Sequence, residues 1–200
     1  AIENLSLTTH SGTHLDAPYH FYPTMNGGER AWTIDEVPLE WCIGNGVVMD
    51  FSDKPDGYKI TAADTAAYFD RIGYTLHDGD IVLLRTDADK LWGKAEYLMA
   101  GAGMSAEATL WLIDHGCHVM GTDGWSWDVP LPIEAQEFER NGDASIIWEA
   151  HRVGREKAYC HIEKLTNLNE LPLTGFQVSC LPVKIKGASA GWCRCVAFLN

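Results

Sequence analysis

The sequence lacks long apolar runs and has few basic residues. Its longest hydrophobic stretches, such as residues 81–84, are interrupted by charges within a few positions, whereas a membrane-spanning helix needs ~20 apolar residues. Lys and Arg total 15 against 28 Asp and Glu, which gives a formal net charge of −13. Such an acidic surface repels a phosphate backbone. We therefore expect neither a membrane nor a nucleic acid as a partner.

The sequence also lacks a C-x-x-C pair and the dense cysteine framework that small secreted domains need. We expect its six cysteines to be free thiols in a reducing compartment, and no secretory leader pattern opens the chain. These features predict a cytoplasmic location. Cys193 and Cys195 could bind a metal, but alternate positions on a strand more often give one buried and one exposed thiol.

No repeat, low-complexity tract or long linker divides the 200 residues. With 46% hydrophobic and 22% charged residues, residues 1–200 are expected to form a single domain with its own core. The sequence opens at Ala1 rather than Met, and we expect an N-terminal portion of the protein to be missing from it.

Short apolar runs between turn-forming residues predict buried strands over residues 47–51 and 80–85. Between these strands, Thr61 followed by Asp64 predicts a capped helix start, and Gly73 predicts the helix end. The segment between the two strands is therefore expected to be a helix.

The second half of the chain continues in the same way. A second helix is expected to begin after Ser105 and end before Gly116, followed by a strand over residues 119–122. The alternation over residues 176–185 predicts strands again. This order of elements predicts an α/β or α+β protein with a mixed sheet.

Side chains that bind metals are concentrated near the start of the chain, within residues 10–20. They are His10, His14, Asp16 and His20. Nitrogen and oxygen donors together suit Zn²⁺, Mn²⁺ or Fe²⁺, whereas Ca²⁺ prefers oxygen alone. On an extended segment His14 and Asp16 point the same way, and a turn at Gly12 lets His10 join them. One histidine alone is more often a satisfied core or surface group, but a cluster of four favours a metal site.

A second group of donors, His151, His161 and Glu163, lies far along the chain. If residues 158–165 form a strand, His161 and Glu163 share one face of it. A buried glutamate needs a partner that offsets its desolvation, and a metal ion is one such partner. A solvated strand face is an equally good interpretation of this pattern.

Residues 10–21 read H-S-G-T-H-L-D-A-P-Y-H-F. They resemble the signature H-x-G-T-H-x-D-x-P-x-H-F of the metal-dependent cyclase superfamily, which includes bacterial kynurenine formamidase and isatin hydrolase. The resemblance continues through residues 83–86, 121–123 and 151–163, and so covers most of the chain. Members of the superfamily usually carry some tens of residues ahead of the histidine cluster.

Residues 125–128, 159–168 and 183–192 favour the isatin-hydrolase-like branch. The resemblance implies an α/β fold, a swivelling β/β/α domain whose mixed, barrel-like sheet is flanked by helices. It also implies a homodimer or a homotetramer.

The resemblance assigns a role to each group of donors. The implied metal ligands, for one or two Mn²⁺ or Zn²⁺ ions, are His10, His14, Asp16, His151 and Glu163, with His161 as a further ligand or a substrate contact. His20 would be the catalytic acid or base, because a free imidazole has a pKa of ~6.5. Asp123 and Asp128 are candidate acceptors for the outer ring protons of the ligand histidines.

The chemistry implied is metal-dependent opening of a C–N bond in a small cyclic amide, as in isatin hydrolase. The alternatives are cleavage of N-formylkynurenine to kynurenine and formate, a lactone or cyclase activity, or a metal-stabilised binding protein. A cluster without cysteine and with spare donors favours an open, catalytic site over a closed structural one. Trp125 and Trp127 could form flat walls for a small neutral aromatic amide, or could be core or interface residues.

Overall fold

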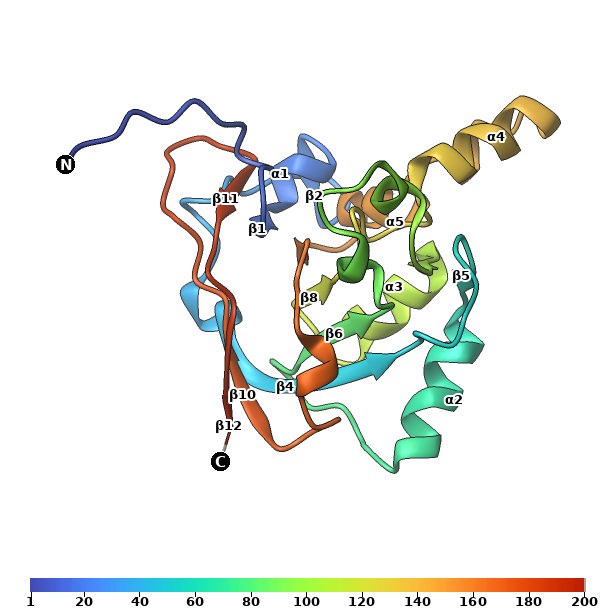
Figure 1. Cartoon of the computed structure of the whole chain (residues 1–200). Helices are drawn as coiled ribbons and strands as arrows, with labels where there is room; N and C mark the ends of the chain where they lie inside the picture. The colour runs from blue at the N-terminus through green and yellow to red at the C-terminus, as the bar shows by residue number, and fades with distance from the viewer. Residues whose placement is uncertain (200) are drawn as a thin grey trace.

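The computed structural model describes residues 1–199. Its main element is a mixed sheet of eight strands, which curls into an open half-barrel with helices against one side (Figure 1). In spatial order the strands are β11 (Ala190–Trp192), β1 (His14–Asp16), β9 (Cys160–Glu163), β8 (Val119–Thr122), β6 (Ile81–Arg85), β4 (Ile43–Asp50), β10 (Phe176–Ser179) and β12 (Val196–Leu199). This architecture confirms the predicted α/β fold with a mixed, barrel-like sheet.

The middle of the sheet is parallel, because β4, β6, β8 and β9 run in the same direction. Helix α2 (Ala62–Ile72) connects β4 to β6, and α3 (Ala106–Asp114) connects β6 to β8. The predicted capping box of α2 is present, and Gly73 ends the helix with a φ of 63°. The side chain of Ser105 accepts a hydrogen bond at the start of α3. Both predicted helices are thus confirmed.

Two hydrophobic cores lie on opposite faces of the sheet. Side chains alternate along a strand, so Val82 and Leu84 of β6 pack in the core beneath α2 and α3. Ile81 and Leu83 pack in the core on the other face. A strand buried on both faces has the continuous apolar sequence seen here.

The remaining elements are short, and most have no counterpart in the sequence prediction. The helices are α1 (Pro18–Phe21), α4 (Leu131–Asn141) and α5 (Glu149–Arg152). Two small sheets pair β2 (Thr24–Met25) with β3 (Glu29–Arg30), and β5 (Lys59–Ile60) with β7 (Gly103–Met104). Turns of 3₁₀ helix span Leu39–Cys42, Ala88–Leu91, Ala95–Met99, Ala144–Ile146, Val153–Arg155 and Leu168–Glu170.

Two expectations for the C-terminal part need correction. The strands expected over residues 176–185 are present only as β10, which ends at Ser179, and beyond it Pro182 forms an isolated bridge with Cys193. Proline has no N–H to donate to a strand ladder, which explains the early end. Cys193 and Cys195 are both partly buried instead of one buried and one exposed, because both lie between β11 and β12, outside a regular strand.

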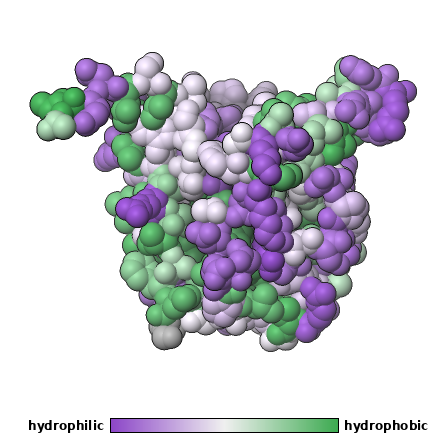
Figure 2. Space-filling view, viewed as in Figure 1, coloured by the Kyte–Doolittle hydropathy of each residue, from purple (hydrophilic) through white to green (hydrophobic). Residues whose placement is uncertain are grey.

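The surface differs between the two sides of the molecule. Hydrophobic residues such as Phe198 and Leu199 are exposed on β12, at one edge of the sheet, whereas the end of α4 is strongly hydrophilic (Figure 2). Within residues 1–199, each helix is too short or too polar to span a bilayer.

Candidate metal centre

The pairing of β1 with β9 brings the two groups of donors together. The strands are antiparallel, with His14 opposite Glu163 and Asp16 opposite His161. Since alternate residues of a strand share one face, all four side chains lie on the same side of the sheet. The strand expected over residues 158–165 is therefore present as β9, and its inward face is polar and buried.

His151 reaches this group from α5, and its orientation is fixed by Asp128. The Nδ1–H of His151 donates to Oδ2 of Asp128 at 2.5 Å. The same carboxylate accepts the backbone N–H groups of Ala150 at 2.7 Å and His151 at 3.2 Å, at the start of α5. Nε2 of His151 consequently faces the cluster, 3.9 Å from Oε1 of Glu163. Asp128 is thus one of the two acceptors suggested by the sequence.

Asp123, the other suggested acceptor, has a different role. Its carboxylate accepts hydrogen bonds from the backbone and hydroxyl of Thr86 and from the backbone of Asp87. These groups lie at the end of β6, so Asp123 joins two neighbouring strands and supports none of the site histidines.

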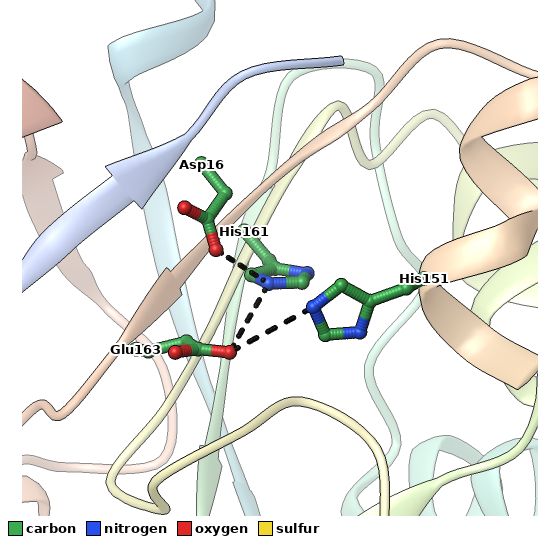
Figure 3. Close-up of side chains that lie close together, drawn as sticks. All are labelled: Asp16, His151, His161 and Glu163. Atoms are coloured by element: carbon green, nitrogen blue, oxygen red, sulfur yellow. Dashed lines mark ion pairs between the residues drawn. The ribbon is translucent and has the colours of Figure 1, made fainter. Parts of the chain in front are cut away.

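Four buried side chains point toward one another at the centre of the site (Figure 3). They are Asp16, His151, His161 and Glu163, and one ligand atom from each lies within 4.8 Å of the others. Nε2 of His161 is 3.0 Å from Oδ2 of Asp16 and 3.5 Å from Oε1 of Glu163. These distances allow a single ion to contact all four residues.

Several of these atoms have no hydrogen bond among the described residues. They include both carboxylate oxygens of Asp16 and both ring nitrogens of His161, all of them buried. Burying a polar atom without a partner is costly, so the close contacts without hydrogen-bond geometry indicate donors arranged to bind a cation. Two imidazoles and two carboxylates form a donor set that suits Zn²⁺ or Mn²⁺.

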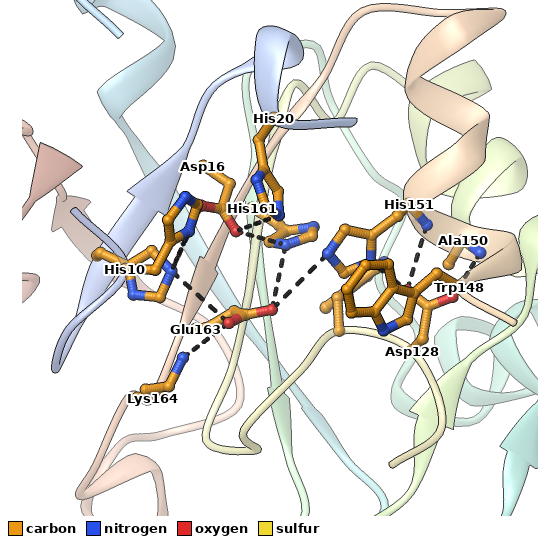
Figure 4. Close-up of polar contacts among 12 residues, drawn as sticks. His10, Asp16, His20, Asp128, Trp148, Ala150, His151, His161, Glu163 and Lys164 are labelled. Atoms are coloured by element: carbon orange, nitrogen blue, oxygen red, sulfur yellow. Dashed lines mark hydrogen bonds and ion pairs between the residues drawn. The ribbon is translucent and has the colours of Figure 1, made fainter. Parts of the chain in front are cut away.

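The three histidines of the N-terminal segment lie around Asp16, and Figure 4 labels two of them, His10 and His20. Nδ1 of His10 is 2.8 Å from Oδ1 of Asp16, and Nε2 of His14 is 3.3 Å from the same oxygen. The Nδ1–H of His14 donates to the carbonyl of Gly12 at 2.8 Å, which directs Nε2 toward Asp16. Nε2 of His20 is 4.0 Å from Oδ2 of Asp16. His10, Asp16 and His20 thus form a second group able to hold an ion.

The site is rich in negative charge. Burial raises the pKa of Asp16, but its contacts with His10, His14 and His161 outweigh burial and hold that pKa well below its usual range. Burial lowers the pKa of His161, yet the carboxylates of Asp16 and Glu163 raise it to about 9. The cluster therefore attracts a proton to a buried imidazole, and a divalent cation would supply the same positive charge.

The side chain of His20 is 26% exposed and that of His10 is 30% exposed, whereas His14 is fully buried. Burial lowers the pKa of His20 to about 4, with smaller contributions from His151, His10 and His161, while the charge of Asp16 opposes the shift. The imidazole is therefore neutral at neutral pH and able to accept a proton.

The tryptophans near the site occupy different positions. Trp127 is fully buried, donates its indole N–H to Oγ1 of Thr109 at 3.0 Å, and packs behind His161 with 6.1 Å between ring centroids. It therefore belongs to the core, one of the two interpretations of this residue. Trp125 is only partly buried and lies beside Lys164, whose Nζ is 5.4 Å from the ring centroid.

Two residues of the site had no signal in the sequence. Trp148 is 37% exposed and stacks on His151, with 5.3 Å between ring centroids. It precedes α5, a helix too short to show a hydrophobic period, so no sequence pattern marks it. Lys164 places Nζ 2.8 Å from Oε2 of Glu163. Only its position next to Glu163 could have identified it.

The sequence of this chain is similar to those of cyclase-like proteins and kynurenine formamidases. Residues 2–129 match the model of the Cyclase family. Cyclase-like protein 1 of Arabidopsis thaliana is 27% identical over 201 residues, covering 98% of this chain and 68% of that protein. Kynurenine formamidase of Erythrobacter litoralis is 26% identical over 198 residues, covering 98% of this chain and 76% of that protein.

Solved structures show the same similarity in three dimensions. Isatin hydrolase A from Labrenzia aggregata, bound to benzyl benzoate, superposes with a TM-score of 0.79 at 28% identity, covering 98% of this chain and 75% of that one. Isatin hydrolase A from Ralstonia solanacearum superposes with a TM-score of 0.81 at 25% identity, covering 98% and 74%.

Proposed function

Because the chain belongs to the Cyclase family, we propose that it is a metal-dependent hydrolase that opens a C–N bond of a small cyclic amide, as an isatin hydrolase does. The observation that carries this proposal is the convergence of four buried donors on one point with the oxygens of Asp16 unpartnered. The similarity to kynurenine formamidase supports a second candidate, cleavage of an aryl formamide.

In this proposal Asp16, His151, His161 and Glu163 hold a divalent ion, Mn²⁺ or Zn²⁺. His10 and His14 complete this site or, with Asp16, contribute to a second one. A bound divalent ion would lower the pKa of water and polarise the substrate carbonyl. Asp128 and the carbonyl of Gly12 keep the ring protons of His151 and His14 away from the ion.

His20 is our candidate for the group that moves the proton. Its ring is partly exposed and lies 4.0 Å from Asp16, at the rim of the cluster, so it can reach both the site and a bound substrate. We assign it two roles in sequence: it accepts a proton from the attacking water and then transfers that proton to the leaving nitrogen. Trp125, beside Lys164, and Trp148, stacked on His151, offer aromatic faces to a small neutral aromatic amide.

The decisive experiment measures metal content and turnover on the same protein. Protein purified without added metal is analysed for elements, then assayed for isatin ring opening by absorbance before and after chelation, with N-formylkynurenine and a lactone in parallel. Bound Mn or Zn with chelator-sensitive isatin turnover is expected. Turnover of N-formylkynurenine alone would favour the second candidate, and a bound metal that stabilises the fold without any turnover would favour a binding protein.

Two variants control this experiment. His161→Gln should lose the metal and the activity, because it removes a buried donor. His118→Gln, which alters a histidine stacked on Trp41 away from the donors, should retain both. We also propose a cytoplasmic homodimer or homotetramer, and elution at the monomer mass of 22.2 kDa would contradict the oligomer.

A further inference from the structure

Lys164 is held in an unusual conformation directly beside the cluster. Its φ is 63°, a backbone region that residues other than glycine rarely adopt. The hydroxyl of Thr13 donates to its carbonyl at 2.6 Å, and its N–H donates to the carbonyl of Gly124 at 3.1 Å. The side chain is only 9% exposed. The surrounding structure therefore fixes the position of this ammonium group.

The ammonium group acts on one oxygen of Glu163 (Figure 4). Nζ of Lys164 lies 2.8 Å from Oε2, which is also 3.6 Å from Nε2 of His14. Oε1 faces His161 at 3.5 Å and His151 at 3.9 Å. A charge-assisted hydrogen bond of the length made by Lys164 restrains the carboxylate. Oε1 is thus the oxygen presented to His151 and His161, and Oε2 is engaged by Lys164.

We propose that Lys164 is a positioning residue that restricts Glu163 to one oxygen toward the bound ion. A catalytic ion needs a coordination position that protein ligands leave open. By occupying Oε2, Lys164 prevents Glu163 from binding with both oxygens and keeps that position available to substrate. This inference rests on the proposed function, because it requires that Glu163 bind an ion.

The charge of Lys164 also determines whether its substitution should strengthen or weaken ion binding. An ammonium group close to the site repels a divalent cation, so its removal strengthens ion binding. The backbone of Glu163 would keep its place without Lys164, because it is paired with His14 on β1, and only the carboxylate would be released. The repulsion therefore outweighs the loss of one restraining hydrogen bond, and a variant without the charge should bind the ion more tightly.

The test uses Mn²⁺ alone as the probe. Its dissociation constant is measured by competition with a chromophoric chelator, and the geometry of the bound ion is followed by electron paramagnetic resonance. Lys164→Met should bind Mn²⁺ roughly ten-fold more tightly and give an altered spectrum. Lys164→Arg, which keeps the charge, should resemble the wild type. Lys157→Met removes the surface ion pair with Asp114 and should change neither reading.

The remaining outcomes each overturn the inference. Unchanged affinity with an unchanged spectrum would show that Lys164 does not act on the ion, and weaker binding by Lys164→Met would show that it only supports the fold. A lower melting temperature without a change in the Mn²⁺ spectrum would lead to the same conclusion. If the wild type bound neither Mn²⁺ nor Zn²⁺, the proposed function would fail as well, so the two failures are distinguishable.

Discussion

Asp16 and Asp123 are both buried aspartates at the ends of sheet strands, yet their surroundings differ completely. Asp123 accepts hydrogen bonds from Thr86 and Asp87 at 2.5 to 3.0 Å. Asp16 is surrounded by imidazoles, and neither of its oxygens has a hydrogen bond among residues 1–199. The same residue type thus stabilises the fold at one position and remains available to a ligand at the other.

The pKa values of the two carboxyls are shifted in opposite directions. Burial raises the pKa of Asp123 to about 6 in spite of its hydrogen bonds. At Asp16 the neighbouring histidines overcome burial and keep the pKa well below its usual range. Burial alone therefore does not identify a functional carboxylate. The distinguishing feature is a charge kept ionised by groups that could themselves bind a metal.

The largest expected effect is that of Asp16→Asn on catalysis. Loss of a ligand shared by both donor groups should lower isatin turnover by ~10³-fold or more, about 4 kcal/mol of transition-state stabilisation. In the chelated protein the substitution should also lower the free energy of unfolding, because contacts with His10, His14 and His161 favour the ionised form of Asp16 in the folded state. Steady-state kinetics and urea unfolding test the two parts. Wild-type turnover in this variant would contradict the role of Asp16 in the site.

Asp123→Asn should lower stability without affecting the metal site. Its carboxamide nitrogen would face N–H donors of Thr86 or Asp87, which should lower the free energy of unfolding by about 2–3 kcal/mol. Metal content per folded chain should not change. Asp78→Asn is the matched control, since the side chain of Asp78 is 87% exposed. Equal stability of the two variants in urea would contradict a structural role for Asp123.

Asp128 caps α5 and also orients His151, so its substitution should have an effect on metal binding that is intermediate in size. Asp128→Asn removes the carboxylate that accepts the ring proton of His151, so the affinity for Zn²⁺ should fall by ~10- to 100-fold. Competition with a chromophoric chelator measures this change. Wild-type affinity in this variant would mean that the orientation of His151 does not depend on the charge of Asp128.

The smallest expected effect concerns Glu134, a buried carboxylate away from the donors. Oε2 of Glu134 accepts the backbone N–H of Trp148 at 3.1 Å, and burial raises its pKa to about 7. A raised carboxyl pKa means that the folded state binds more protons than the unfolded state, so stability falls as pH rises from ~4.5 to ~7. Glu134→Gln keeps an acceptor but cannot ionise.

This variant should therefore be more stable than the wild type at pH 8 by about 1 kcal/mol, less than the full linkage value because solvent reaches part of the group. At pH 4 the two proteins should be alike. Urea unfolding of chelated protein at both pH values measures the difference. A constant offset between the proteins across this range would show that ionisation of Glu134 is not the cause.

Much of the site was predictable because its pattern is local. His14 and Asp16, like His161 and Glu163, are two residues apart, and a strand places such pairs on one face whatever surrounds it. The caps at Thr61 and Ser105 are equally local, and both are present. Helix α5 was missed because four residues form about one turn, which is too short to show a hydrophobic period.

Local residue patterns specify the donor types, the faces that the donor pairs share on their strands, and the caps that begin the two predicted helices. The packing of distant segments sets the pairing of β1 with β9, in a register that places Asp16 opposite His161, and makes Asp128 rather than Asp123 the support of His151. The difference arises because alternation and capping depend on residues within a few positions of one another. Strand register and the partner of a buried carboxylate depend on how distant segments pack, which no local pattern specifies.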